Sequence, residues 1–346
     1  MQRNSLIKIA AIAAIFAIGA EGAYAQKSLK IGTVARPGIP LGDALKDGLK
    51  AWTEKASGGK LLIEPHYAGS ICGEQKCGEQ ANQGLLQMWT SSTANFGNFS
   101  TALSIFNLPY IFKNLDTANT ISAGWLGEAT MAEAEKSSQH HVLAVFASGG
   151  FRQLGNTQRP VHAPADLKGI KIRVTKSPIE FMLFKNWGGI PVPFDWLQTY
   201  QAMQTGVVDG LYVQVPWQYL FKMHEAAVYY TEMGGLWGGN HISMDQKQYN
   251  KLSADEKAWL AQGIVEFEKL VRSSDKEWVE AGVAKIKGEI KEWYVPNEAE
   301  MKLWRAGAVQ AWKDSRDTYD GKLAERALNE QGLQSFVATL KSAGAL

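Results

Sequence analysis

The strongest constraint on the fold is an alternation of strand-like and helix-like runs that occurs twice along the chain. Residues 28–34 and 61–67 are apolar runs typical of strands, and residues 41–55 between them repeat apolar side chains at helical spacing. A strand–helix–strand unit pairs its strands in parallel through a right-handed crossover. The same pattern restarts near residue 152, with a strand at 171–174, so the sequence predicts two α/β units.

The last third of the chain is predicted to be helical. An amphipathic run covers 256–287, and Ser253 followed by Glu256 three residues later forms the pattern of a capping box at its start. Two further helices are expected over 298–319 and 323–343. A length of 346 residues also favours two domains, at roughly 150 residues per domain. We therefore expect a two-domain α/β protein with a long helix and a helical C-terminal tail.

The overall charge is close to neutral. A formal net charge of +2, with 20% charged residues of both signs interspersed, provides no basic face. Proteins that bind nucleic acid or anionic membranes show such a face, so neither partner is expected.

The N-terminus predicts export. Arg3 and Lys8 precede an apolar run at 9–18, which Ala23-Tyr24-Ala25 follows. This is the layout of a cleavable secretory signal at residues 1–25. The apolar run is shorter than the ~20 residues that span a bilayer, and no later stretch is apolar enough. We expect a mature periplasmic protein that starts near Gln26 and does not itself span a membrane.

Cys72 and Cys77 are the two cysteines of the chain, and both lie in a glycine-rich loop. Because export implies an oxidising compartment, we favour a disulfide between them. Two free thiols and half of a metal site are the alternatives. Histidine or further cysteine at ligand spacing does not accompany them, so a metal is not expected.

One cleft is predicted to gather the side chains that bind a ligand. In open α/β folds, ligands bind beyond the carboxyl ends of the strands. The loops in that position are 35–40, 91–98, 149–152, 173–177 and 212–217. They supply Arg36, Ser92, Asn95, Arg152, Arg173, Tyr212, Gln214 and Trp217. Trp237 is the ninth candidate for ligand binding. Trp89 and Trp196 are also expected near this cleft, and the 12 tryptophans of the chain favour a partly apolar or aromatic ligand.

Arg173 is the strongest candidate for a ligand-binding side chain. A guanidinium binds a carboxylate through two parallel hydrogen bonds, and a charge at the end of an apolar strand needs a partner. The alternative is an ion pair with Asp166 or Asp209. Arg152 follows two glycines, and a loop there could simply expose it.

Catalytic motifs are lacking. The sequence has no Gly-x-Ser-x-Gly, phosphate loop or His-Glu-x-x-His, and its six histidines are scattered. This favours a binding protein without a cofactor over an enzyme. An exported enzyme acting on a small organic acid and a solute sensor for a signalling receptor remain as alternatives.

Several short motifs resemble those of a known family. They are residues 105–112 (IFNLPYIF), Gly150-Phe151-Arg152, Arg159-Pro160-Val161, residues 164–174 and residues 204–210 (QTGVVDG). In this order they resemble the landmarks of the DctP family, the extracytoplasmic solute receptors of tripartite ATP-independent periplasmic (TRAP) transporters.

The resemblance implies two α/β domains joined by hinge strands and a long connecting helix, which close around the ligand. Residues 26–150 with about 238–277 would form domain I, and 151–237 with about 278–346 domain II. Arg173 would be the main carboxylate clamp and Arg152 an assisting one. The membrane subunits of a TRAP transporter are the implied partner.

The sequence departs from the family after Asp209-Gly210. Relatives often carry Gln-Glu-Asn or a Glu-Trp pair there, whereas this chain has Leu211-Tyr212-Val213. Tyr212 in place of a carboxylate argues against a bound metal, and Val213 makes the wall less polar. We therefore expect a monocarboxylate with an apolar or aromatic body, with an organosulfonate as the alternative ligand.

Overall fold

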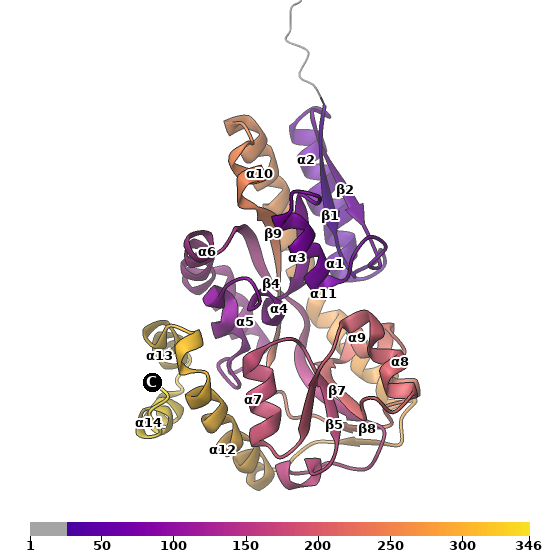
Figure 1. Cartoon of the computed structure of the whole chain (residues 1–346), viewed down its shortest axis with the longest axis vertical. Helices are drawn as coiled ribbons and strands as arrows, with labels where there is room; N and C mark the ends of the chain where they lie inside the picture. Colours follow the sequence, from indigo (N-terminus) through magenta and orange to yellow (C-terminus); the bar gives the residue numbers. More distant parts are fainter. Residues whose placement is uncertain (1–25) are drawn as a thin grey trace, which may run out of the picture.

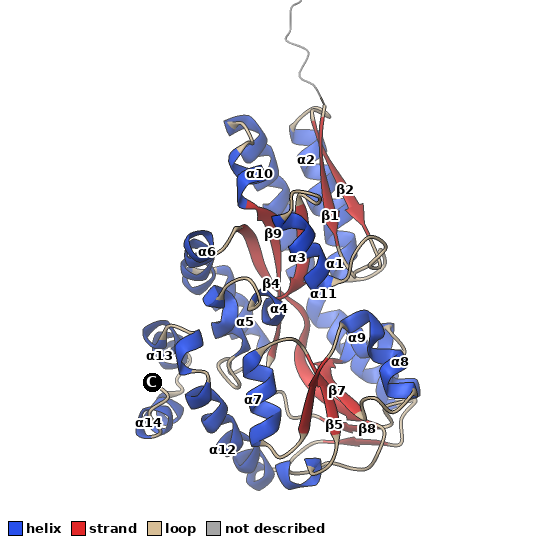
Figure 2. Ribbon diagram, in the orientation of Figure 1, coloured by secondary structure: helices blue, strands red, loops and turns tan. Residues whose placement is uncertain are grey.

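The structure, a computed structural model, describes residues 26–346. The predicted signal segment at 1–25 lies outside the described residues. Within the described range, each helix is too short or too polar to cross a bilayer. The strands form two sheets that are continuous through one shared strand, and helices pack around them (Figure 2).

The first sheet forms what we call lobe I, with strand order β2-β1-β3-β9-β4. β1 (Lys27–Gly32) pairs in parallel with both β2 (Leu61–His66) and β3 (Met88–Ser92). The helical connection from β1 to β2 comprises α1 (Pro40–Asp43), a π-helical segment (Ala44–Lys50) and α2 (Ala51–Ala56). The predicted strand–helix–strand unit is thus confirmed.

The second sheet forms lobe II. In it β5 (Lys171–Val174) lies between β7 (Gly210–Gln214) and β6 (Ile190–Pro193), parallel to both. β8 (Tyr229–Thr231) pairs with β10 (Glu292–Tyr294) and with the end of β4.

β4 (His140–Asn156) is one 17-residue strand that belongs to both sheets (Figure 1). Its first part pairs with β9 (Trp237–Asp245), and its last part, from Arg152 on, pairs with β7. The prediction of a loop at 149–152 is wrong. The strand continues because Gly149 and Gly150 adopt φ angles of 93° and 74° within a local irregularity, a conformation that costs glycine little.

β9 is a regular strand although its sequence is rich in glycine. From Trp237 onwards it is buried along its whole length. Its pairing with β3 on one side and β4 on the other supplies the stability that its glycines lack.

α11 (Ala254–Lys287) is the long predicted helix, and the capping box of Ser253 and Glu256 is present at its start. It packs against both lobes. Its Phe267 contacts Phe146 of β4 edge to face, and its Trp278 contacts Trp217 of lobe II in the same way.

The C-terminal tail contains α12 (Glu298–Asp314), α13 (Gly321–Glu330) and α14 (Gln334–Ser342). The single helix predicted over 323–343 is interrupted by Gly332, whose φ is 76°. α13 and α14 pack in a core with lobe I side chains such as Phe106 and Leu126. The predicted domain bounds, which assign the tail to domain II, stay a prediction.

The remaining helices lie between the strands and cover the sheets. They are α3 (Glu74–Asn82), α4 (Thr93–Phe96), α5 (Leu115–Ala123), α6 (Trp125–Ser137), α7 (Pro178–Asn186), α8 (Thr199–Gln204), α9 (Val215–Leu220), α10 (Gln246–Asn250) and the short 3-10 turns Thr101–Asn107, Pro164–Leu167, Trp196–Gln198, Met223–Glu225 and Arg316–Thr318.

Candidate functional site

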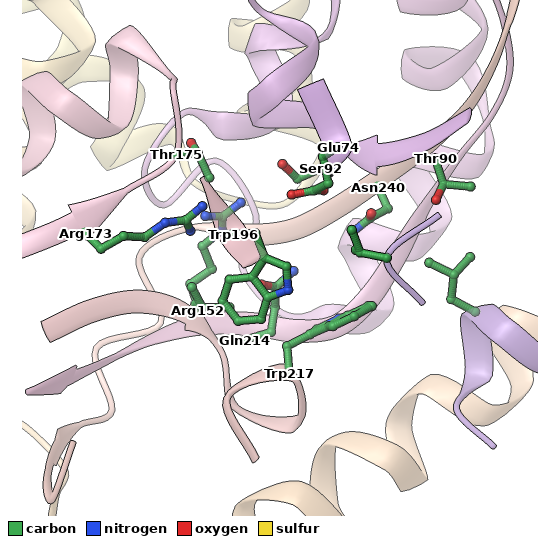
Figure 3. A pocket seen from close by; sticks show the side chains of 13 residues that line it. Glu74, Thr90, Ser92, Arg152, Arg173, Thr175, Trp196, Gln214, Trp217 and Asn240 are labelled. Atoms are coloured by element: carbon green, nitrogen blue, oxygen red, sulfur yellow. Dashed lines mark hydrogen bonds between the residues drawn. The ribbon is translucent and has the colours of Figure 1, made fainter. Parts of the chain in front are cut away.

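A cavity of about 40 Å³ lies where the two lobes meet (Figure 3). Lobe I lines it with Val34, Leu41, Glu74, Thr90, Ser92 and Asn240. Lobe II lines it with Arg152, Arg173, Thr175, Trp196, Val213, Gln214 and Trp217. At roughly 10–15 Å³ per water-sized group, this volume corresponds to about three such groups. Both lobes therefore contribute side chains to this one cavity.

Arg173 enters the cavity from β5 and is almost fully buried. Its Nε and one NH₂ group donate to the carbonyl oxygen of Phe194 at 3.1 and 2.9 Å, which fixes the plane of the guanidinium. The group also lies over the ring of Trp196, 5.6 Å from its centroid. Since a guanidinium has five N–H donors, three of them remain for a ligand.

The charge of Arg173 persists at neutral pH. Burial lowers its pKa from 12.5 to about 10, and the nearby carboxylates of Glu180 and Glu74 oppose that shift. The acids considered as alternative partners are bonded elsewhere. Asp166 accepts from the N–H groups of His162 and Ala163, and Asp209 accepts from the N–H of Lys171.

Arg152 forms a buried ion pair, so the alternative that a loop exposes it does not hold. Its NH1 lies 2.8 Å from Oε1 of Glu180 on α7, and the two side chains are 2% and 0% exposed. The second oxygen of Glu180 accepts from the N–H of Thr175 at 2.9 Å. The charge of Arg152 is thus balanced within the protein, and Arg173 is the better placed of the two for a ligand carboxylate.

Glu74 provides a carboxylate on the opposite wall. Its Oε1 accepts from the hydroxyl of Ser91 at 3.0 Å and from the N–H of Ser92 at 2.9 Å, and its Oε2 accepts from the side-chain amide of Asn95 at 3.1 Å. Burial raises its pKa, against the opposing effects of these hydrogen bonds and of Arg173.

The predicted disulfide holds the segment that carries Glu74. Cys72 and Cys77 are bonded, with their Cα atoms 5.2 Å apart, and Glu74 begins α3 between them. A Cβ atom on Gly32 of β1 would lie 2.6 Å from the sulfur of Cys77, so the bridge packs directly against the sheet.

The structure brings five of the nine predicted ligand-binding residues together on the cavity lining. These are Arg173, Arg152, Ser92, Gln214 and Trp217. Their role in binding a ligand stays a prediction.

The other four predicted residues lie off the lining. Tyr212 is fully buried in lobe II, where its hydroxyl accepts from the N–H groups of Gly235 and Leu236. Trp237 packs against Phe106 and Phe112. Asn95 acts behind the lining, as a donor to Glu74. Arg36 lies at a separate surface pocket near Pro216 and Lys285.

Sequence reasoning missed Glu74, Glu180 and Thr175. One signal existed for Glu180, because it lies four residues before the buried Phe184 and therefore on the same face of a helix. Glu74 lies between the two cysteines, which predicted a disulfide in this loop but gave no sign that the Glu74 carboxylate reaches the cavity.

Comparisons with known proteins agree on one family. The model for the DctP family, bacterial extracellular solute-binding protein family 7, matches residues 31–318. A solute-binding protein from Chromohalobacter salexigens is 29% identical over 252 residues, which cover 72% of this chain and 74% of that protein. The C4-dicarboxylate-binding periplasmic protein DctP of Rhodobacter capsulatus is 23% identical over 299 residues, 86% of each chain.

Solved structures show the same architecture. A TRAP periplasmic solute-binding protein from Bordetella bronchispeptica, with density assigned as pantoate, is 26% identical with a TM-score of 0.80, over 87% of this chain and 98% of that one. One from Pseudomonas putida F1, with bound D-glucuronate, is 24% identical with a TM-score of 0.82, over 87% and 96%. The two-domain fold of this chain is therefore that of periplasmic binding proteins.

Proposed function

Because this chain belongs to the DctP family of bacterial extracellular solute-binding proteins, we propose that it captures a small organic carboxylate in the periplasm and delivers it to the membrane subunits of a TRAP transporter. The observation that carries this proposal is Arg173, which keeps its charge, is fixed by Phe194 and has three N–H donors left in a cavity between two lobes. The ligands described for the Bordetella and Pseudomonas proteins, pantoate and D-glucuronate, are also carboxylates.

The lining favours a monocarboxylate with an apolar or aromatic body. Trp196, Trp217 and Val213 form an apolar wall next to Arg173. The indole N–H of Trp217 donates to the carbonyl oxygen of Ser148 at 3.1 Å, so its ring presents carbon atoms to a ligand. A larger apolar body requires these two indoles to move apart, since the cavity holds only about 40 Å³.

Ligand binding would stabilise the closed arrangement of the lobes. Arg173 belongs to lobe II, whereas Ser92 and Glu74 belong to lobe I, so a ligand that contacts all three favours closure. The lobes already touch at the rim. A Cβ on Gly69 of lobe I would lie 2.7 Å from the side chain of Leu197 in lobe II.

The test is the affinity of purified protein for a panel of carboxylates and sulfonates, measured by isothermal titration calorimetry. Arg173→Ala should weaken binding of the best acid by ~2–5 kcal/mol, since it removes one partner of a desolvated charge pair. Arg173→Lys should recover part of this loss, because it restores the charge but not the two-pronged geometry. Unchanged affinity in a folded Arg173→Ala protein, or no binding of any acid in the panel, would refute the proposal.

A further inference from the structure

We propose that Glu74 makes this site selective for monocarboxylates that carry a hydrogen-bond donor, a hydroxyl or an ammonium group, close to the carboxylate, and that it rejects dicarboxylates. The inference rests on the proposed function, because it concerns the same cavity. Figure 3 shows the Glu74 carboxylate and the guanidinium of Arg173 directed into one space from opposite walls.

The first argument comes from counting acceptor positions. An ionised carboxylate has about four lone-pair sites on its two oxygens. Ser91 and Ser92 occupy both sites on Oε1 of Glu74, and Asn95 occupies one site on Oε2. One acceptor site on Oε2 therefore remains on a side chain that lines the cavity. A ligand donor can fill it.

The second argument is the balance of charge. Arg152 forms a direct ion pair with Glu180, whereas the carboxylates of Glu180, Glu74 and Asp195 act on Arg173 without a direct ion pair. Arg173 is therefore the one guanidinium of the lining that is left to hold a ligand carboxylate. A second carboxylate on the ligand would face Glu74 at short range, and like charges in a buried site disfavour one another. A hydroxyl or an ammonium group meets no such repulsion.

The third argument is that Glu74 cannot easily turn away. It is the first residue of α3 and follows Cys72 and Gly73, and the disulfide ties the first turn of that helix to the loop before it. Gly73 faces lobe II so closely that a Cβ there would lie 3.3 Å from the carboxylate of Asp195. Closure of the lobes thus confines the Glu74 carboxylate against the ligand.

The test is a matched series of three-carbon acids, titrated calorimetrically into the full mature chain. Propionate has no donor, L-lactate adds a hydroxyl, L-alanine adds an ammonium and malonate adds a second carboxylate. A parallel series of 3-phenylpropionate, phenyllactate and phenylalanine covers ligands with an aromatic body. We expect the hydroxyl- or ammonium-bearing acid to bind at least tenfold more tightly than its parent acid, and malonate to bind more weakly than propionate. Comparing the hydroxy acid with the amino acid in each series shows which of the two donor groups the site prefers.

Two variants assign the preference to a residue. Glu74→Gln should reduce the donor preference to less than threefold and raise the affinity for malonate, because an amide N–H replaces an acceptor. Glu79→Gln on the same helix, whose carboxylate pairs with Lys76 outside the cavity, should leave the whole series unchanged.

The outcomes are distinct. Equal binding of propionate, lactate and alanine by the wild-type chain would overturn the inference while leaving carboxylate capture intact, and this comparison needs no variant to fold. A donor preference that persists in Glu74→Gln would also overturn it. Failure of every acid, including those of the wider panel, would overturn the proposed function itself.

Discussion

The ion pair between Arg152 and Glu180 offers the most direct test of how the site is built. Glu180→Gln keeps the size of the side chain, and its amide oxygen can still accept from the N–H of Thr175. It leaves Arg152 without a counter-ion at a position that is 2% exposed. NH1 of Arg152 would still donate to the carbonyl oxygen of Tyr212, but at 3.5 Å, and the Nε of Arg152 already lacks a partner.

The expected loss of stability is large. Removing one partner of a buried pair costs about 3–5 kcal/mol, because the other charge stays buried and uncompensated. The assay is urea unfolding followed by the fluorescence of the 12 tryptophans. A double replacement, Arg152→Met with Glu180→Leu, removes both charges and should cost less than Glu180→Gln alone.

The same variant should bind an acidic ligand more tightly. With Glu180 neutral, Arg152 on the cavity lining has lost its counter-ion, and a ligand carboxylate can replace it. The stabilisation by a saturating acid should therefore be larger in Glu180→Gln than in the wild type. The free energy of unfolding of Glu180→Gln, measured without ligand, would refute this reasoning if it lay within about 1 kcal/mol of the wild-type value. A difference that small is typical of a substitution with little structural effect.

Two further predictions concern the disulfide and a buried acid. The Cys72→Ala/Cys77→Ala double variant should lose about 2 kcal/mol of stability in urea unfolding. This is the loop-closure entropy expected for a disulfide between cysteines at a sequence separation of 5. Unchanged stability of the double variant would contradict this prediction. Burial raises the pKa of Asp275 on α11 from 3.8 to about 6, so its contribution to stability is full below pH 3.8 and is lost as the pH rises through 6. Between pH 7 and pH 4 the wild type should therefore gain about 2 kcal/mol relative to Asp275→Asn, and parallel pH profiles of the two proteins would exclude this.

Local patterns were enough to predict the parts of the fold that are stabilised locally. The first strand–helix–strand unit follows from hydrophobic periodicity, and the start of α11 follows from Ser253 and Glu256, which interact within one turn. Arg173 could be selected because a lone charge on an apolar strand needs a partner wherever the strand lies.

Features that depend on distant partners could not be predicted. Gly149 and Gly150 look like a loop, and only pairing with β9 and β7 keeps them inside a strand. Glu74 is an ordinary surface-type residue until the N–H of Ser92 and the amide of Asn95 reach it from another element. Tyr212 was predicted at the cavity but lies behind its lining. Its hydroxyl accepts hydrogen bonds there from the backbone N–H groups of residues 235 and 236.

The shared strand β4 also dictates the order in which the molecule can assemble. β3 pairs with β9, which ends at Asp245, so the sheet of lobe I stays incomplete until β4 to β8 have already been synthesised. Lobe II in turn awaits β10 at Glu292–Tyr294. Every contiguous stretch of the described chain that holds all strands of one lobe also holds strands of the other, and a chain that stops before Trp237 leaves an edge of β3 open to pairing with other strands. The two native sheets are therefore complete only when the chain is present as far as Tyr294.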